Sequence, residues 1–355
     1  MKNKEIVIAA GGTGGHVFPA LSLYDNLKKE KYNVTLTSDL RGLKFIDKSK
    51  NLNLKIIDTT NFSNRNYFTS SCKIIYAIIK SFFLITKIKP QLIFGMGGYA
   101  SLPICFSAIL LKKPFVIYEN NLILGKVNKF LLPYAKKIFL AYEITERIPN
   151  KYKNKIFYTG NILRQEILDL KNETKADNKK LNILVLGGSQ AAKIFGEKLP
   201  EIFIKLKENE VNFKLYQQCI ISQKDNLKKV YDDKKIHNEL FNFSFDIKNY
   251  YKVADLAISR AGSSALSELL HCKIPIIAIP LKSAADNHQE KNANYFEKKG
   301  YCVNIDEDEI NIKLFNFINL AYKDKSILEN IKKKQNYHND KFALDNINNE
   351  IKYLL

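Results

Sequence analysis

A glycine-rich turn near the N-terminus constrains the fold of this chain most strongly. The apolar run 6–10 leads into Gly11-Gly12-Thr13-Gly14-Gly15-His16, and a segment with helical periodicity follows. This order predicts a buried parallel strand, a tight turn and the N-terminus of a helix. Free N–H groups at such a helix end bind anions or polar oxygens, and glycines let a ligand approach closely. The segment matches neither a Walker A loop nor a dinucleotide fingerprint.

His16 is the unusual residue of this turn. An imidazole can exchange a proton near neutral pH, so His16 is a candidate general base. Many glycine turns serve only for packing, but four glycines together with a histidine favour a ligand site.

Polar strand ends recur in the first half of the chain. The run 91–94 leads into Gly95-Met96-Gly97-Gly98-Tyr99, and the run 114–118 leads into Glu119-Asn120-Asn121. The carboxyl ends of parallel strands lie at one edge of a sheet, where open α/β sheets bind ligands. We therefore expect all three strand ends at the same edge.

The pattern restarts in the second half. After the charged stretch 171–180, interpreted as a surface loop or linker, the run 182–186 leads into Gly187-Gly188-Ser189. We predict an α/β protein with two Rossmann-like parallel-sheet domains facing a cleft. Further apolar runs predict strands at 33–37, 54–57, 138–141, 156–161, 213–218, 241–245, 254–260, 275–280 and 301–305, and the tail 323–355 is expected to be helical.

Charge and cysteine usage limit the function classes. The 355 residues carry a net charge of +20, which predicts an acidic partner: nucleic acid, an anionic membrane surface or a phosphorylated substrate. We find no nucleic-acid-binding module and expect no nucleic acid partner.

Five cysteines without a CxxC pair suggest reduced thiols in a cytosolic protein. The first strand begins so early that we expect no signal peptide, and we expect no stretch to reach the ~20 apolar residues of a membrane span.

The segment 72–88 is very apolar but contains Lys73, Lys80 and Lys87. This spacing of seven places the lysines on one narrow stripe of a helix. We favour a core helix with one solvent-exposed edge. The alternative is a helix in a membrane interface, with the lysines at headgroup level.

In the second half, Ser189 and the pair Ser263-Ser264 each stand at a predicted helix N-terminus, where hydroxyl and N–H groups can hold a pyrophosphate. Glu268, one turn further, could accept hydrogen bonds from ribose hydroxyls. Gln289 suits a sugar, and Arg164 a nucleotide or phosphate. We expect no metal site, because the acidic segment 306–308 is explained by capping of a following helix.

The chain resembles the MurG family of glycosyltransferases in residues 11–20, 95–99, 187–190 and 259–262, together with Glu268. The resemblance extends over essentially the whole chain. It implies a GT-B fold and the transfer of N-acetylglucosamine (GlcNAc) from UDP-GlcNAc to the C4 hydroxyl of the muramoyl-pentapeptide sugar of lipid I. The product is lipid II for peptidoglycan synthesis, formed with inversion and without a metal or other cofactor.

The resemblance also implies an organisation of the chain. Residues 1–163 would form an acceptor-binding, membrane-associating domain, and residues 164–335 a UDP-GlcNAc-binding domain. Residues 336–355 would form a helix that packs back on the first domain. The implied location is peripheral, on the cytoplasmic side of the inner membrane. The implied partners are UDP-GlcNAc, lipid I, an anionic membrane surface and other cell-wall synthesis proteins.

The site residues that the resemblance implies fall in both halves. A uracil contact is expected between Phe243 and Ile247, and the acceptor diphosphate at the loops of Gly12, Gly97, Gly98 and Tyr99. His16 is the candidate base, with Glu119 as the competing candidate. The donor contacts are Thr13, Gly14, Gly15, Asn121, Arg164, Ser189, Ser263, Ser264, Ala265, Leu266, Ser267, Glu268 and Gln289.

The chain departs from the family pattern at several positions. Tyr118 stands where a histidine is usual, and a phenol cannot do the work of an imidazole at neutral pH. Ala191-Ala192 replaces Gly-Ala, and Ile162 replaces a proline. The alternatives are another GT-B enzyme that uses a UDP-sugar with a different acceptor, or a UDP-GlcNAc 2-epimerase.

Overall fold

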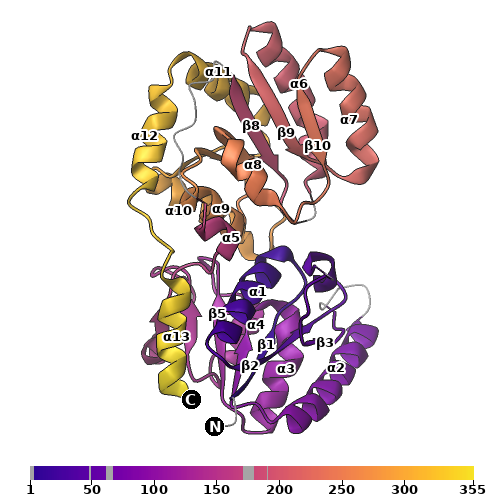
Figure 1. Cartoon of the computed structure of the whole chain (residues 1–355), viewed down its shortest axis with the longest axis vertical. Coiled ribbons are helices and arrows are strands. Elements are labelled where there is room, and N and C mark those ends of the chain that lie inside the picture. The colour runs from indigo at the N-terminus through magenta and orange to yellow at the C-terminus, as the bar shows by residue number, and fades with distance from the viewer. Residues whose placement is uncertain (1–3, 48, 61–66, 171–179, 190) are drawn as a thin grey trace. The chain divides into compact units, whose positions relative to one another are not determined.

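The computed structural model describes residues 4–47, 49–60, 67–170, 180–189 and 191–355. The chain divides into two units. Unit 1 comprises Met1–Arg164 and Asp340–Leu355, and unit 2 comprises Gln165–Asn339 (Figure 1). Apart from Lys180, the predicted linker 171–180 lies outside the described residues.

Unit 1 is built on a seven-stranded parallel sheet with the order β3-β2-β1-β4-β5-β6-β7. Its central strands are buried on both faces, as their continuous apolar runs predict. The strands are β1 (Glu5–Ala9), β2 (Asn33–Ser38), β3 (Leu54–Ile56), β4 (Leu92–Gly95), β5 (Phe115–Glu119), β6 (Ile138–Leu140) and β7 (Ile156–Tyr158).

Helices cover this sheet. Val7 and Ala9 of β1 share one hydrophobic core with Ala77, Ile104 and Leu131, which come from three successive crossover helices. The last helix of the chain returns to unit 1, where Glu350 pairs with Lys137 at 3.1 Å. The helices of unit 1 are α1 (Gly14–Lys29), α2 (Tyr67–Ile88), α3 (Gly98–Leu110), α4 (Lys126–Leu131) and α13 (Ala343–Leu354) (Figure 1).

Unit 2 repeats the design with a six-stranded parallel sheet in the order β10-β9-β8-β11-β12-β13. The strands are β8 (Leu181–Leu186), β9 (Phe213–Gln218), β10 (Asn238–Phe241), β11 (Leu256–Ser259), β12 (Ile276–Ala278) and β13 (Cys302–Asn304). The helices are α5 (Gln165–Leu168), α6 (Lys193–Glu208), α7 (Ile221–Asp233), α8 (Ile247–Val253), α9 (Ser263–His271), α10 (His288–Lys298), α11 (Phe315–Lys323) and α12 (Ser326–Gln335). Two Rossmann-like parallel-sheet units confirm the predicted fold class.

The predicted strand 241–245 is wrong. Strand β10 ends at Phe241, because the polar residues that follow form a turn instead of a ladder. Asn242 Nδ2 donates to the carbonyl of Cys219 at 3.0 Å, and the N–H of Asp246 donates to Ser244 Oγ at 3.1 Å.

Helix α2 is not the core helix that we favoured. Its buried residues form a narrow stripe of mostly small side chains: Ser70, Ile74, Ala77, Ser81 and Ile85. Phe68 is 82% exposed and Phe83 68% exposed, and Ile75, Tyr76 and Ile79 are also exposed. The small side chains pack on the unit, and five large apolar side chains stay exposed at the surface.

The expectation that no stretch reaches the length of a membrane span is also wrong. By length and composition alone, Phe68–Ile88 is long and apolar enough to cross a membrane, and 28% of its most apolar window is buried. A helix of this kind that carries Lys73, Lys80 and Lys87 is also typical of one that lies in the membrane interface.

Candidate active site

The first glycine turn is held by a residue that the sequence analysis missed. Asp39 follows β2 and is fully buried, and its Oδ1 accepts hydrogen bonds from the N–H groups of Gly12 and Gly42, both at 2.8 Å. Its Oδ2 pairs with Arg41 at 2.6 Å. A Cβ at Gly11 would lie 2.5 Å from Asp39 Oδ1, so the turn needs glycine here. The N–H of Gly12, expected to face the acceptor diphosphate, is therefore engaged by Asp39.

The second glycine turn, between β4 and α3, lies against His16. A Cβ at Gly98 would lie 3.1 Å from Cε1 of His16, and one at Gly97 would lie 3.5 Å from its Cδ2. The Nδ1 atom of His16 is 3.4 Å from Thr13 Oγ1. The structure therefore brings the first two glycine turns together with the half-buried imidazole between them, while Thr13 is exposed.

The third strand end joins the same group. Asn120 follows β5, and its Nδ2 donates to the carbonyl of Gly15 at 3.0 Å. Asn121 Nδ2 donates to Asn120 Oδ1 at 2.9 Å. The expectation that the three polar strand ends meet at one edge of the sheet is confirmed.

Glu119 is buried and its carboxylate is fully engaged. Oε1 accepts from the N–H of Asn121 at 3.1 Å and from its Nδ2 at 3.2 Å. Oε2 accepts from the N–H of Gly125 at 2.9 Å and from Asn128 Nδ2 at 3.0 Å. Burial raises the pKa of Glu119 above its ordinary value, and the four N–H donors act in the opposite sense.

Tyr118 points away from this group. Its hydroxyl donates to the carbonyl of Gly160 at 3.4 Å and accepts from the N–H of Ile162 at 3.1 Å. Burial raises the pKa of Tyr118 well above its ordinary value, so the phenol stays neutral. Two residues after Ile162, the guanidinium carbon of Arg164 lies 4.7 Å from the ring centroid of Phe18 on α1.

In unit 2, the glycine turn after β8 is anchored by Gln218, which the sequence analysis also missed as a site residue. Its Oε1 accepts from the N–H of Gly187 at 3.0 Å, and its Nε2 donates to the carbonyl of Asn242 at 2.9 Å. Ser189 is half-buried on this turn.

Helix α9 carries six of the thirteen expected donor contacts, the largest group on one element. Ser263, Ser267 and Glu268 are buried, as is Leu266, whereas Ser264 and Ala265 are half-buried. Tyr251 of α8 donates its hydroxyl hydrogen bond to Glu268 Oε2 at 3.1 Å, which orients the carboxylate. Asn292 of α10 donates through Nδ2 to the carbonyl of Ala261 at 3.1 Å and so holds the turn before α9.

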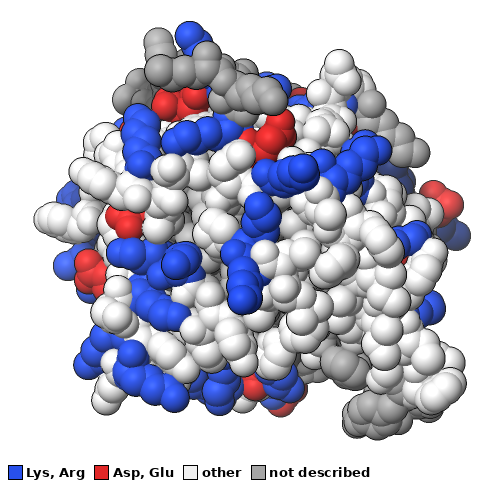
Figure 2. All heavy atoms as spheres, turned by 90° about the horizontal axis from the view of Figure 1, so that it is seen from below, with Lys and Arg blue, Asp and Glu red and all other residues white. Residues whose placement is uncertain are grey.

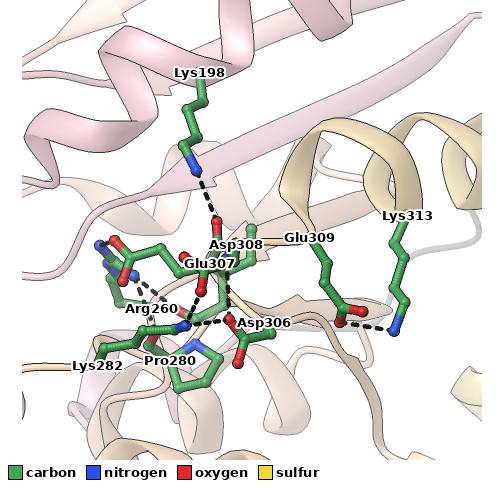
Figure 3. Close-up of polar contacts among 10 residues, drawn as sticks. Lys198, Arg260, Pro280, Lys282, Asp306, Glu307, Asp308, Glu309 and Lys313 are labelled. Carbon is green, nitrogen blue, oxygen red and sulfur yellow. Dashed lines mark hydrogen bonds and ion pairs between the residues drawn. The ribbon is translucent and has the colours of Figure 1, made fainter.

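The buried side chain of Arg260 anchors the loop that leads into α9. Its NH1 donates to the carbonyls of Ile279 and Pro280, both at 3.2 Å, and its NH2 pairs with Glu307 Oε1 at 2.9 Å (Figure 3). Its guanidinium carbon lies 4.8 Å from the ring centroid of Phe195. One buried cation thus ties together the loops that follow β11, β12 and β13.

The acidic segment 306–308 does not cap a helix, contrary to our expectation. The helical segment that follows begins at Ile310 without a side-chain cap. Instead, Asp306 pairs with Lys282 at 2.9 Å, Asp308 also pairs with Lys282, and Glu307 pairs with Arg260 (Figure 3). These basic residues lie far away in the sequence, so no local signal predicts the pairing. Among the described residues, no group of three or more His, Cys, Asp or Glu side chains is arranged to hold a metal ion.

Two further expected contacts lie on loops of unit 2. Gln289 Oε1 accepts from the N–H of Leu281 at 3.0 Å, so this side chain closes the loop between β12 and α10. In the segment expected to meet uracil, the rings of Phe243 and Phe245 pack edge to face with centroids 4.9 Å apart.

Comparison with known proteins identifies the family. Residues 6–140 match the glycosyltransferase family 28 N-terminal domain, and residues 182–347 match its C-terminal domain. The chain is 38% identical over 357 residues to the UDP-N-acetylglucosamine--N-acetylmuramyl-(pentapeptide) pyrophosphoryl-undecaprenol N-acetylglucosamine transferase of Pelagibacter ubique, with 98% of each chain covered. The chain belongs to the MurG family of glycosyltransferases. It is therefore a hexosyltransferase with the GT-B fold.

Solved structures agree with this assignment. The crystal structure of Acinetobacter baumannii MurG is 25% identical to this chain, with a TM-score of 0.77 and 99% of each chain covered. A UDP-N-acetylglucosamine 2-epimerase at 13% identity has a TM-score of 0.71, with 99% of this chain and 96% of the other covered. At that identity the second likeness concerns the fold alone, so the MurG family assignment stands over the epimerase alternative.

Proposed function

We propose that this chain transfers GlcNAc from UDP-GlcNAc to the C4 hydroxyl of the muramoyl sugar of lipid I and so forms lipid II. The observation that carries this proposal is the gathering of His16, the Gly97-Gly98 turn and Asn120 at one edge of the unit 1 sheet, in a chain of this family. We assign the acceptor diphosphate to the two glycine turns, with Gly97, Gly98 and Tyr99 as its contacts and Gly12 in the turn that Asp39 holds through the Gly12 N–H.

The chemistry is a single displacement. The C4 hydroxyl oxygen bonds to the anomeric carbon of GlcNAc, the bond from that carbon to UDP breaks, and UDP leaves with the electron pair. The hydroxyl proton passes to a base, because a neutral hydroxyl is a weak nucleophile. Attack opposite the leaving group inverts the anomeric configuration.

We assign the base to His16. Thr13 Oγ1 lies beside Nδ1, and we propose that the other ring nitrogen, Nε2, takes the proton. Both oxygens of Glu119 already accept two hydrogen bonds each, so this carboxylate would have to give up its donors to act as a base. We therefore assign to Glu119 the support of the loop that presents Asn121.

The donor belongs to unit 2 in this proposal. N–H groups at the start of α9 and at the Ser189 turn suit the UDP diphosphate, and the Glu268 carboxylate, oriented by Tyr251, suits the ribose hydroxyls. Arg164, Gln289, and Thr13, Gly14, Gly15 and Asn121 complete the donor contacts, with Ala265, Leu266 and Ser267 on α9.

We also propose that the protein lies peripherally on the anionic cytoplasmic face of the inner membrane. Helix α2 offers exposed Phe68, Ile75, Tyr76, Ile79 and Phe83. At the amino edge of the unit 1 sheet, each turn from a helix to the next strand exposes a lysine. Figure 2 shows the molecule from below, with lysine and arginine side chains spread across that face. The four turn lysines are Lys31, Lys89, Lys112 and Lys136.

The test is UDP release from UDP-GlcNAc in the presence of EDTA, with and without a lipid I analogue. Release that requires the analogue and ignores EDTA supports the proposal. Release without an acceptor would instead indicate a hydrolysing epimerase. Binding of UDP-GlcNAc without turnover would show that the acceptor is a different one.

A further inference from the structure

The segment 160–162 is held by side chains from two distant parts of the chain. Tyr118 at the end of β5 is 2% exposed, and its hydroxyl bridges the carbonyl of Gly160 and the N–H of Ile162. Asp340 is also buried, and its Oδ1 accepts from the N–H of Asn161, between these two residues, at 3.0 Å. Backbone groups of three successive residues are thus engaged by two side chains.

The fit around this segment is tight. Gly160 has a φ of 88°, and a Cβ there would lie 2.9 Å from Asp340 Oδ1. An L-residue would therefore be strained and would also displace the carboxylate. We call Tyr118, Gly160, Ile162 and Asp340, with Asn161, the crossover clasp.

The crossover clasp lies next to the two points where the chain leaves unit 1 and re-enters it. The chain leaves unit 1 after Arg164 and returns to it at Asp340. The outgoing segment is therefore fastened two residues before it leaves, and the incoming segment at its first residue. Tyr118 thus fixes the outgoing segment to β5, and Asp340 fixes the incoming segment to the outgoing one. Strand β5 ends at Glu119, two residues before Asn121.

We propose that Tyr118 is a positioning residue for the transfer reaction: through the crossover clasp it fixes the backbone that presents Arg164 to the UDP-sugar. This inference rests on the proposed function, in which Arg164 contacts the donor. Without the hydroxyl, the carbonyl of Gly160 loses its donor and the N–H of Ile162 loses its acceptor. Arg164 is then positioned less accurately. Tyr118 itself touches neither substrate.

The test compares four variants. Tyr118→Phe removes only the hydroxyl, and Asp340→Ala removes the second anchor, whereas Asp340→Asn keeps an oxygen that can accept from Asn161. The matched control is Tyr231→Phe in unit 2, which removes a buried hydroxyl that donates to Gln217 Oε1 at 2.7 Å, away from both connections.

The dissociation constant of UDP-GlcNAc is measured by calorimetry, which needs no acceptor, together with KM, kcat and hydrogen exchange of a peptide that spans residues 159–165. We expect Tyr118→Phe and Asp340→Ala to weaken UDP-GlcNAc binding about tenfold and to speed exchange, with a smaller change in kcat. Asp340→Asn and Tyr231→Phe should bind like the wild type.

Wild-type binding constants and KM in both Tyr118→Phe and Asp340→Ala would overturn the inference, even if both variants melt earlier. A loss in kcat alone would also overturn it, because it would place the hydroxyl at the chemical step. If the wild type binds UDP-GlcNAc but does not use lipid I, the proposed acceptor fails while the binding comparison still tests the clasp.

Discussion

The imidazole of His16 packs against Gly98. A Cβ added to Gly98 would lie 3.1 Å from Cε1 and 3.3 Å from Nδ1 of the ring, and the φ of Gly98 is 68°. These two residues come from different glycine turns. The second turn therefore holds the ring of the proposed base in place.

Gly98→Ala should displace His16. The substitution costs about 1–2 kcal/mol of backbone strain at positive φ, and the methyl group also pushes the ring. We expect the turnover rate with a lipid I analogue to fall at least about tenfold. The control is Gly300→Ala, which has a similar φ of 73° but meets only the flexible side chain of Lys334. Equal activity in both variants would contradict a role for this contact.

His16→Ala should remove the proposed base. We expect kcat to fall by about 10²- to 10⁴-fold, the usual contribution of general base catalysis, with little change in the binding of UDP-GlcNAc. His237→Ala, an exposed histidine before β10, should leave kcat unchanged. A variant with normal kcat and only a raised KM would assign the proton to another group.

Glu119 should give the stability of unit 1 an unusual pH dependence. Burial raises its pKa in the folded chain above the ordinary value of 4.5, so the folded state binds the proton more tightly than the unfolded state. Its contribution to the free energy of unfolding therefore decreases as pH rises above 4.5, and becomes constant once both states are ionised.

The measurement is denaturant unfolding over a pH series that begins below the ordinary carboxyl values of 3.8 and 4.5 and extends to neutral pH, because linkage to each proton starts at the pKa of the unfolded state. The difference in unfolding free energy between wild type and Glu119→Gln should shrink as pH rises. Asp232→Asn provides the opposite sign below pH 3.8, because hydrogen bonds from Lys228 and Asn238 lower the pKa of Asp232 and its contribution is lost as pH falls through that range. A difference that grows with pH for Glu119→Gln would refute this account.

The Arg260–Glu307 pair should matter for both stability and donor binding. The Arg260 side chain is 7% exposed and that of Glu307 12% exposed, so Glu307→Ala leaves a buried guanidinium without its counter-charge. We expect a loss of about 3 kcal/mol in unfolding free energy and a higher KM for UDP-GlcNAc. Lys282→Ala breaks exposed ion pairs in the same cluster and should cost at most about 1 kcal/mol. Equal losses in the two variants would count against the buried pair as the anchor of α9.

Helix α2 should carry membrane binding. Phe83→Ser removes an exposed apolar side chain, so the melting temperature should hold while binding to anionic vesicles falls about tenfold. Ile221→Ser on α7, also exposed, is the control and should bind normally. Binding should weaken with salt, because each lysine near an anionic surface contributes ~1 kcal/mol. Equal binding to neutral and anionic vesicles would exclude the electrostatic part.

The parallel sheets and their ligand-bearing edges could be predicted from sequence. Apolar runs that end in glycines or amides, such as those before Gly11 and Glu119, are local signals, and parallel topology then places the strand ends together. The predicted strand 213–218 coincides with β9, because its pattern is also a local signal within one short segment. The strand predicted over 241–245 failed because side-chain hydrogen bonds of Asn242 and Ser244 compete with the ladder.

The sequence by itself determined the family, the two-sheet architecture and the glycine turns of the candidate site, because these depend on residue patterns within short segments. Only the tertiary structure decided which groups hold those turns: Asp39 on Gly12, Gln218 on Gly187, and Asn292 on Ala261. It likewise turned Tyr118 toward Gly160 and left the apolar face of α2 exposed. Such contacts join residues far apart in the chain, and a buried polar group takes whichever partner the packed fold brings within about 3 Å.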